Sequence, residues 1–220
     1  LLLPALAAAQ VYGPVGPPSG TTAAAAAAAA AAPSAPPSNS SQINIDVAAG
    51  GSFVFNPSNI TAAVGTLVTF YFPGGSTPHS VTQSSFDNPC TYLASTSNSS
   101  GGFDSGLVGT GSTFTINVTD TNPIWFHCKS VSPTHCPGFG MVGSINAPSS
   151  GDTFAAFQAK AMSSNAPTET DNGPVTGGVG AVATSGPVSD TGSSSSGSSS
   201  DATKVVASVS LALLSATIAV

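Results

Sequence analysis

Basic residues are almost absent from this chain. Three lysines and no arginine stand among 220 residues, nine residues are acidic, and the formal net charge is -6. Binding to nucleic acid or to an anionic membrane surface requires clustered positive charge, which this composition cannot supply. Nucleic-acid binding is therefore excluded.

Charge of either sign is also scarce. Charged residues make up 5% of the sequence, and 24 glycines and 18 prolines interrupt it, so the chain can form at most one compact domain. The three cysteines are an odd number in a chain rich in Ser, Thr and Asn. Such a composition is typical of an extracellular protein in which one disulfide persists and the remaining thiol has another use.

Both ends carry sequence typical of protein targeting. Residues 1–9 are apolar and close on an Ala-x-Ala site, which predicts the remainder of a secretory signal. Residues 204–220 contain an apolar stretch shorter than the roughly 20 residues of a bilayer span. With the Ser/Gly-rich spacer before it, this tail predicts a signal for a glycosylphosphatidylinositol (GPI) anchor attached near residues 192–197. The alternatives are a frayed apolar N-terminus, and a spanning or uncleaved C-terminal tail.

Two low-complexity segments flank a central region. Residues 10–41 contain ten consecutive alanines among prolines, which keep this linker out of a packed core. Residues 164–203 are mainly Gly, Ser, Thr, Pro and Val without a repeating apolar face, so we expect a flexible, O-glycosylated stalk. Both flanking segments are expected to be disordered, which leaves residues 42–163 as the folded domain.

The central region is divided into short runs rich in Val, Ile, Phe and Thr, bounded by Gly, Pro and Asn. Such runs predict the strands of a sandwich or barrel. The expected strands are 43–47, 52–55, 60–64, 66–72, 80–83, 113–118, 124–128 and 142–145. Their number and spacing favour an all-β Greek-key β-sandwich. Residues 152–162 carry small and aromatic residues at helical spacing and predict one short C-terminal helix.

Four Asn-x-Ser/Thr sequons lie in or beside this domain. Each would have to lie at the surface if it were glycosylated. A chain this rich in Ser and Thr contains some sequons by chance, so they support secretion only weakly. The candidate sites are Asn39, Asn59, Asn98 and Asn117.

Candidate metal ligands are concentrated near the end of the domain. Cys128 ends an expected strand, His135 follows after six residues, and Met141 precedes the next strand. A soft thiolate, two imidazoles and a weak axial thioether are the ligands of copper that alternates between two oxidation states. His79 is the suitable second imidazole outside this loop. His127 is not counted, because alternation along its strand turns it away from Cys128.

Other roles for these residues remain open. Cys128 could be an inert buried thiol or could pair with Cys136, and both candidate histidines could be surface loop residues. Met141 could simply fill the core. A closed zinc site made by the two histidines, Cys128 and Cys136 would leave Cys90 unpaired.

On these residues, the segment from about Ile43 to Asn146 resembles a cupredoxin. It is most similar to the phytocyanin-like domains of fungal serine-rich extracellular proteins, which share the order of signal, domain, Ser-rich stalk and lipid-anchor signal. The segment Phe103-Asp104-Ser105-Gly106 also recurs in that group. Plant phytocyanins usually leave four residues between the Cys and His ligands, whereas six stand here. The resemblance implies one type 1 copper bound by His79, Cys128, His135 and Met141, and a disulfide between Cys90 and Cys136.

The resemblance implies a protein that transfers single electrons and is not an enzyme. A multicopper oxidase would require several His-x-His pairs, which three histidines do not supply. We expect a monomer held at the cell surface or in the cell wall by its lipid anchor, with a redox partner that the sequence does not name. The alternative is a structural or adhesive wall protein on the same scaffold, for which metal binding is incidental.

Overall fold

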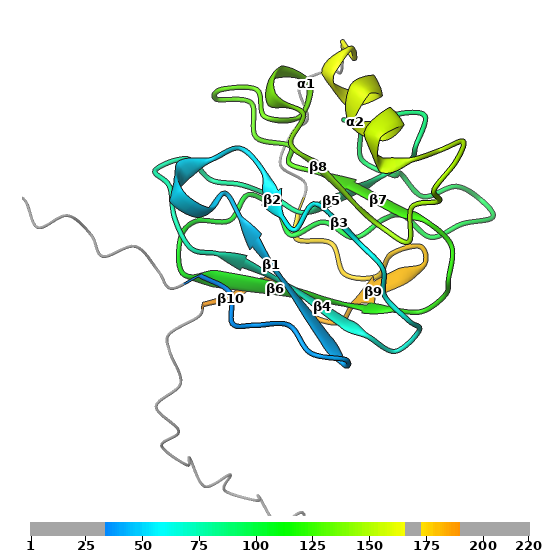
Figure 1. Cartoon of the computed structure of the whole chain (residues 1–220), viewed down its shortest axis with the longest axis horizontal. Helices are drawn as coiled ribbons and strands as arrows, with labels where there is room; N and C mark the ends of the chain where they lie inside the picture. The colour runs from blue at the N-terminus through cyan, green and yellow to red at the C-terminus, as the bar shows by residue number, and fades with distance from the viewer. Residues whose placement is uncertain (1–33, 166–172, 190–220) are drawn as a thin grey trace, which may run out of the picture. The chain divides into compact units, whose positions relative to one another are not determined.

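The computed structural model describes residues 34–165 and 173–189 (Figure 1). The predicted secretory signal at 1–9, most of the linker at 10–41 and the predicted anchor signal at 204–220 lie outside the described residues. Among the helices that are described, none has the length and hydropathy to cross a bilayer.

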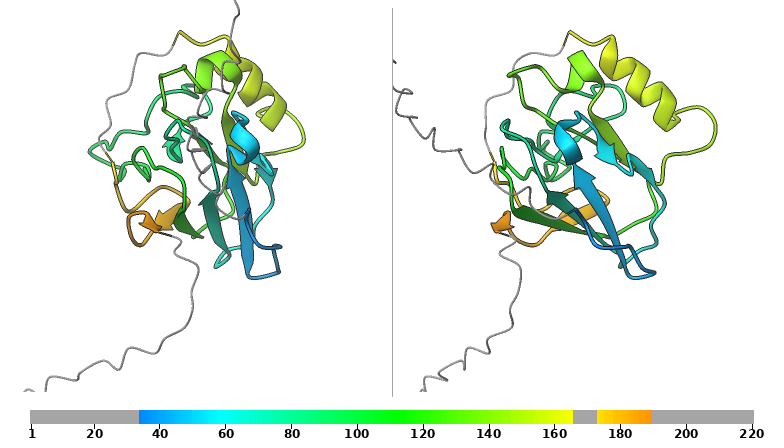
Figure 2. Two further views of the ribbon diagram at one scale, coloured as in Figure 1. Left: turned by 90° about the vertical axis from the view of Figure 1, so that its left-hand side faces the viewer. Right: turned by 60° about the vertical axis from the view of Figure 1, so that its left-hand side comes forward.

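Two β-sheets pack against each other around a shared apolar core (Figures 1 and 2). One sheet has the order β10-β6-β4-β1-β2, and β9 also pairs with β6. Its strands are β1 (Gln42–Val47), β2 (Phe55–Asn56), β4 (Leu67–Phe72), β6 (Ser112–Val118), β9 (Ala181–Ala183) and β10 (Val188–Ser189). The second sheet has the order β3-β8-β7-β5. Its strands are β3 (Asn59–Ile60), β5 (Thr82–Ser84), β7 (Ile124–His127) and β8 (Val142–Ile145).

Both sheets are mixed. The pairs β1–β4 and β3–β8 are parallel, and the other pairings are antiparallel. Each of the eight strands expected from the sequence overlaps a strand of the structure. The expected β-sandwich with one short helix after its ligand-bearing strands is confirmed.

Alternation along β6 shows why this sequence forms a two-layer fold. Phe114, Ile116 and Val118 are buried between the sheets, while the residues between them are partly exposed. In β7, by contrast, all four residues are buried, because a second apolar cluster covers the outer face of that strand. Trp125 on this outer face contacts Phe157 of the helix α2, with ring centroids 4.7 Å apart.

The two α-helices are short and lie beside β7 and β8 of the second sheet (Figure 1). Helix α2 (Phe154–Met162) begins after Thr153, whose hydroxyl accepts the backbone N–H of Ala156. Helix α1 (Cys136–Phe139) is a single turn, and a 3-10 turn η1 (Ala49–Gly51) follows β1.

The structure corrects the expected stalk at residues 173–189. This segment does not stand apart from the domain, since β9 and β10 both pair with β6 and Val175 forms a bridge with Asp104. Its buried residues are small, with Ala181 and Ala183 packed into the core, so the sequence shows no recognisable apolar face. A strand of three residues whose buried side chains are alanines has too weak a hydrophobic pattern to be predicted from the sequence.

Candidate metal centre

Three buried side chains meet at one end of the sandwich: His79, Cys128 and His135. The Sγ atom of Cys128 lies 3.2 Å from Nδ1 of His135 and 3.7 Å from Nδ1 of His79. One ligand atom from each residue lies within 4.8 Å of the other two. The structure therefore brings together the thiol and both imidazoles that the sequence singled out.

Hydrogen bonds of the backbone hold these residues in place. Cys128 directly follows β7, and its N–H donates to the carbonyl of Met141 (3.0 Å). The N–H of His135 donates to the carbonyl of Ser130 (2.9 Å), which closes the six-residue loop between the two ligands. His79 forms a two-bond bridge with Val108 (3.0 and 2.7 Å). Each candidate ligand is thus fixed through its own main chain.

Ser80 connects the His79 loop to the cysteine. Its backbone N–H donates to the Sγ of Cys128 (3.3 Å), and its hydroxyl accepts the backbone N–H of Lys129 (2.9 Å). A hydrogen bond to the sulfur is one of the features that adjust the redox potential of a copper–thiolate site.

Burial favours the neutral form of all three groups. It lowers the pKa of His79 to about 4, with a smaller contribution from His135, and it also lowers the pKa of His135. Burial raises the pKa of the Cys128 thiol to about 11, against the opposing effect of hydrogen bonds from Ser130 and Ser80. Neutral imidazoles offer lone pairs to a cation, and a bound ion would displace the thiol proton.

The donor set fits copper. A soft sulfur lies beside two imidazole nitrogens, and both kinds of donor bind copper well. A closed zinc site that includes Cys136 does not fit, because that cysteine is joined to Cys90 in a disulfide.

Met141 is fully buried in the same apolar cluster as Cys128. Its N–H donates to the carbonyl of His135 (3.2 Å), and its carbonyl accepts from Cys128, so its main chain is tied to both residues. Axial ligation by its thioether stays a prediction.

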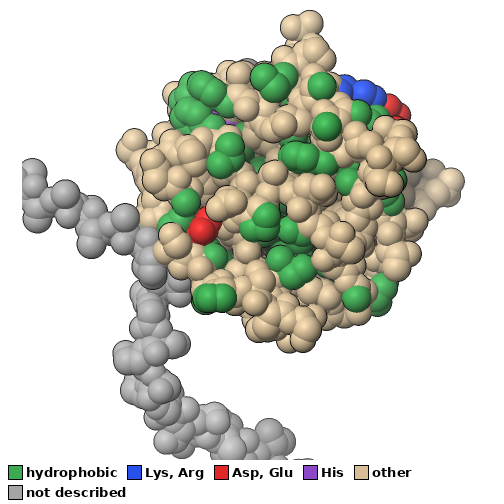
Figure 3. Space-filling view, viewed as in Figure 1, with side chains coloured by type: hydrophobic (Ala, Val, Ile, Leu, Met, Phe, Trp, Pro, Cys, Tyr) green, Lys and Arg blue, Asp and Glu red, His purple; other side chains and the backbone are tan. Residues whose placement is uncertain are grey.

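An aromatic ring that the sequence analysis missed covers the histidines. The centroid of the Phe53 ring lies 4.3 Å from that of His135 and 6.2 Å from that of His79. The ring of Phe139 also contacts Phe53, with centroids 4.5 Å apart. Hydrophobic side chains gather over this end of the molecule, with a small area of histidine surface between them (Figure 3). The site therefore lies just below an apolar surface.

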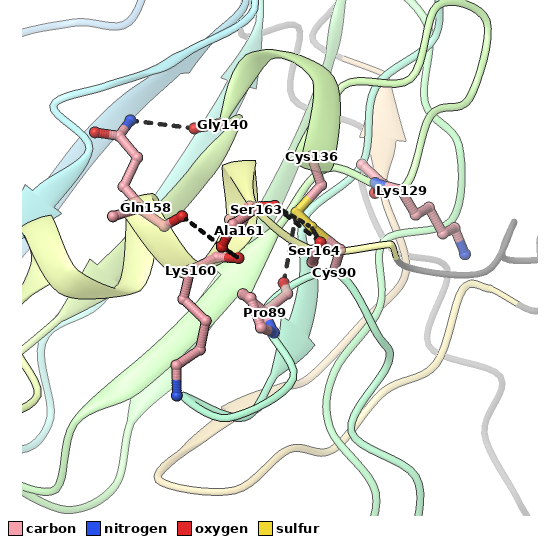
Figure 4. Close-up of a disulfide and its surroundings, with 12 residues drawn as sticks. Pro89, Cys90, Lys129, Cys136, Gly140, Gln158, Lys160, Ala161, Ser163 and Ser164 are labelled. Atoms are coloured by element: carbon pink, nitrogen blue, oxygen red, sulfur yellow. Dashed lines mark hydrogen bonds between the residues drawn. A yellow bond between two sulfur atoms is a disulfide. The ribbon is translucent and has the colours of Figure 1, made fainter.

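The structure contains a disulfide between Cys90 and Cys136, the pair that the resemblance implied (Figure 4). Cys128 remains a free thiol. Because Cys136 directly follows His135, the disulfide ties the ligand loop to the segment before Cys90. The end of α2 lies beside it, and the hydroxyl of Ser164 donates to the Cys90 sulfur (3.4 Å).

The remaining residues singled out from the sequence lie elsewhere. His127 is buried in β7 and is not part of the His79, Cys128 and His135 cluster. Three of the sequons are exposed, whereas the fourth asparagine is half-buried on β6 between β4 and β9. The exposed ones are Asn39, Asn59 and Asn98, and the half-buried one is Asn117. Glycosylation at these positions stays a prediction.

Comparison with known proteins gives consistent matches. Residues 41–147 match a family described as "Copper binding proteins, plastocyanin/azurin family". A protein of Arthroderma benhamiae named "Probable GPI-anchored cupredoxin-1" is 38% identical over 134 residues, which are 60% of this chain and 66% of that protein. An "Extracellular serine-rich protein" of the same fungus is 37% identical over 137 residues, 60% of this chain and 52% of that protein. The chain therefore spans less than two thirds of either relative.

Among solved structures, a pseudoazurin from Sinorhizobium meliloti is similar with a TM-score of 0.30 and 20% identity, covering 47% of this chain and 71% of the other.

Proposed function

We propose that the protein holds one type 1 copper and transfers single electrons, on the premise that residues 41–147 match the plastocyanin/azurin family of copper-binding proteins. His79, Cys128 and His135 would bind the ion, with the thioether of Met141 as a weaker fourth ligand. Copper bound in this way supplies a centre that alternates between two oxidation states.

The observation that carries the proposal is the convergence of one thiol and two imidazole Nδ1 atoms in a buried site. The main-chain hydrogen bonds around the site would hold the ligands in one arrangement in both oxidation states of the ion. A thiolate, two imidazoles and a thioether would together complete the coordination of the ion, which would leave no position for a substrate. The proposal therefore includes no catalytic reaction at the metal.

The proposed location is the cell surface, through a GPI anchor. Support comes from the apolar tail at 204–220 and from the names of the two fungal relatives, one called GPI-anchored and the other extracellular. Treatment of intact cells with a phosphatidylinositol-specific phospholipase should release the protein into the medium. Protein that stays bound to the cells after this treatment and retains peptides from 205–220 would contradict the anchor.

Titration of the purified, metal-free protein with Cu(II) tests the metal proposal. We expect an intense visible charge-transfer band that saturates at one copper per chain and is absent from Cys128→Ser. His79→Gln and His135→Gln should lose or strongly change the band, whereas His127→Gln, a buried histidine outside the cluster, should retain it. Weak ligand-field absorption alone in the wild type would overturn the proposal and favour a structural or adhesive role.

A further inference from the structure

A buried ion pair lies directly beside the candidate metal centre. The Nζ atom of Lys129 is 2.5 Å from Oδ2 of Asp104, and the two side chains are 2% and 3% exposed. Lysine is almost never fully buried unless it is paired, and taking both charges out of water is costly. Asp104 and Lys129 are not among the candidate ligands, and neither was singled out as functional in the sequence.

A closed ring of hydrogen bonds connects this pair to the residue that contacts the cysteine sulfur. The backbone N–H of Lys129 donates to the hydroxyl of Ser80 (2.9 Å), which lies 2.8 Å from the hydroxyl of Thr82. Thr82 uses its one hydroxyl proton to donate to Oδ1 of Asp104 (3.0 Å), so Ser80 must be the donor to Thr82. The ring returns to Lys129 through its ammonium group.

We propose that the Lys129–Asp104 pair is a positioning element of the metal centre, which holds the Ser80 N–H against the sulfur of Cys128. The inference rests on the proposed copper site, since it assigns these residues a role toward that ion. Lys129 follows Cys128 in the chain and Ser80 follows His79, so the ring locks together two loops that each carry a ligand. A displacement of Ser80 would change the hydrogen bond to the sulfur directly.

The segment 173–175 completes this element by covering the carboxylate. Val175 and Asp104 exchange two backbone hydrogen bonds (3.0 and 2.8 Å). A Cβ atom placed on Gly173 would lie 3.2 Å from Cγ of Asp104 and would overlap the backbone of Gly106. This close approach keeps water from the pair, which strengthens its attraction and lengthens the lifetime of the ring.

Two variants that leave the net charge unchanged test the proposal on the full-length protein. Thr82→Val breaks the ring and keeps both charges, and the double variant Asp104→Asn with Lys129→Met removes both. In the metal-free protein, we expect hydrogen exchange at the Ser80 amide to accelerate in each variant. In the copper-loaded protein, we expect both to lower the reduction potential, because a weaker N–H contact leaves more electron density on the sulfur and favours Cu(II).

The exposed ion pair between Lys160 and Asp87 provides the matched control. Its side chains are 38% and 84% exposed, and its two atoms lie 2.8 Å apart. Asp87→Asn with Lys160→Met makes the same chemical changes away from the site and should leave the Ser80 amide and the potential unchanged.

Distinct results separate a failure of this inference from a failure of the copper proposal. Folded variants with unchanged Ser80 exchange would show that the pair serves stability alone, whether or not copper binds. An equal effect in the Lys160 control would also overturn the inference. If the double variant does not fold, Ser80 exchange and the reduction potential of Thr82→Val alone test the inference. If Ser80 exchange accelerates in the variants but the wild type shows no charge-transfer band with copper, the ring does hold the Ser80 N–H in place, and the copper proposal alone is overturned.

Discussion

The ring of Phe53 lies against the imidazole of His135, with centroids 4.3 Å apart and the planes inclined by 35°. This contact joins the loop after β1 to the ligand loop before α1. His135 is fully buried, and its Nε2 atom has no hydrogen-bond partner among the described residues. The Phe53 ring therefore packs directly against a buried imidazole that has one nitrogen without a hydrogen-bond partner among the described residues.

Replacement of Phe53 by alanine should open the site to water and small molecules. We expect faster removal of bound copper by a soluble chelator, because the ring that shields His79 and His135 is lost. The measurement is the decay of the charge-transfer band after chelator is added. Val54→Ala, at the next residue and 44% exposed, is the control. Equal rates of copper loss in Phe53→Ala and the wild type would contradict the shielding role.

The sequence predicted those parts of the fold that local patterns encode. Alternation in β6 and the apolar runs of β4 and β7 each depend on neighbouring residues, so their strands could be located within a residue or two. The spacing of Cys128, His135 and Met141 likewise reflects one strand, one loop and the start of the next strand. His79 could be chosen because the chain has three histidines, of which His135 lies in the ligand loop and His127 is excluded by alternation along its strand.

Contacts between distant segments could not be predicted in this way. Phe53 is one of several aromatic residues in the β-rich region, and nothing in its Gly-rich loop indicates that the loop folds over His135. The Lys129–Asp104 pair joins residues 25 positions apart, and a lone lysine after a strand ordinarily predicts a solvated residue. The strand β9 was missed because two buried alanines carry little hydrophobic signal.

Loss of the Cys90–Cys136 disulfide should destabilise the metal-free protein. The sequence separation of 46 residues corresponds to about 3–4 kcal/mol in the chain-entropy model. Denaturant unfolding of the Cys90→Ala, Cys136→Ala double variant measures the change. We also expect weaker copper binding, since Cys136 is adjacent to His135 and the loop loses its covalent attachment. Unfolding free energies that agree within error would show that packing around Trp125 and Phe157 already fixes this region.

Gly143 should not tolerate a side chain. It pairs with Phe126 across β7 and β8, and a Cβ atom there would overlap the Phe126 ring, which is itself fully buried. Gly143→Ala should lower the free energy of unfolding by about 1–3 kcal/mol, because the ring must move within a packed core. Gly109→Ala is the control, since no atom lies within 4 Å of the added methyl group. An equal loss of unfolding free energy in both variants would contradict the steric explanation and would indicate a cost common to any replacement of glycine.

Met141 offers the sharpest test of the ligand set, because it is both a candidate axial ligand and a buried core residue. Glutamine in its place would present an amide oxygen, a harder donor that favours Cu(II), so Met141→Gln should lower the reduction potential. Leucine conserves the volume and removes the donor, with an expected cost below about 1.5 kcal/mol in stability. Met141→Leu should therefore raise the potential while the fold stays intact. If both variants retain the wild-type potential and spectrum and differ only in unfolding free energy, Met141 fills the core and the copper is held by His79, Cys128 and His135 alone.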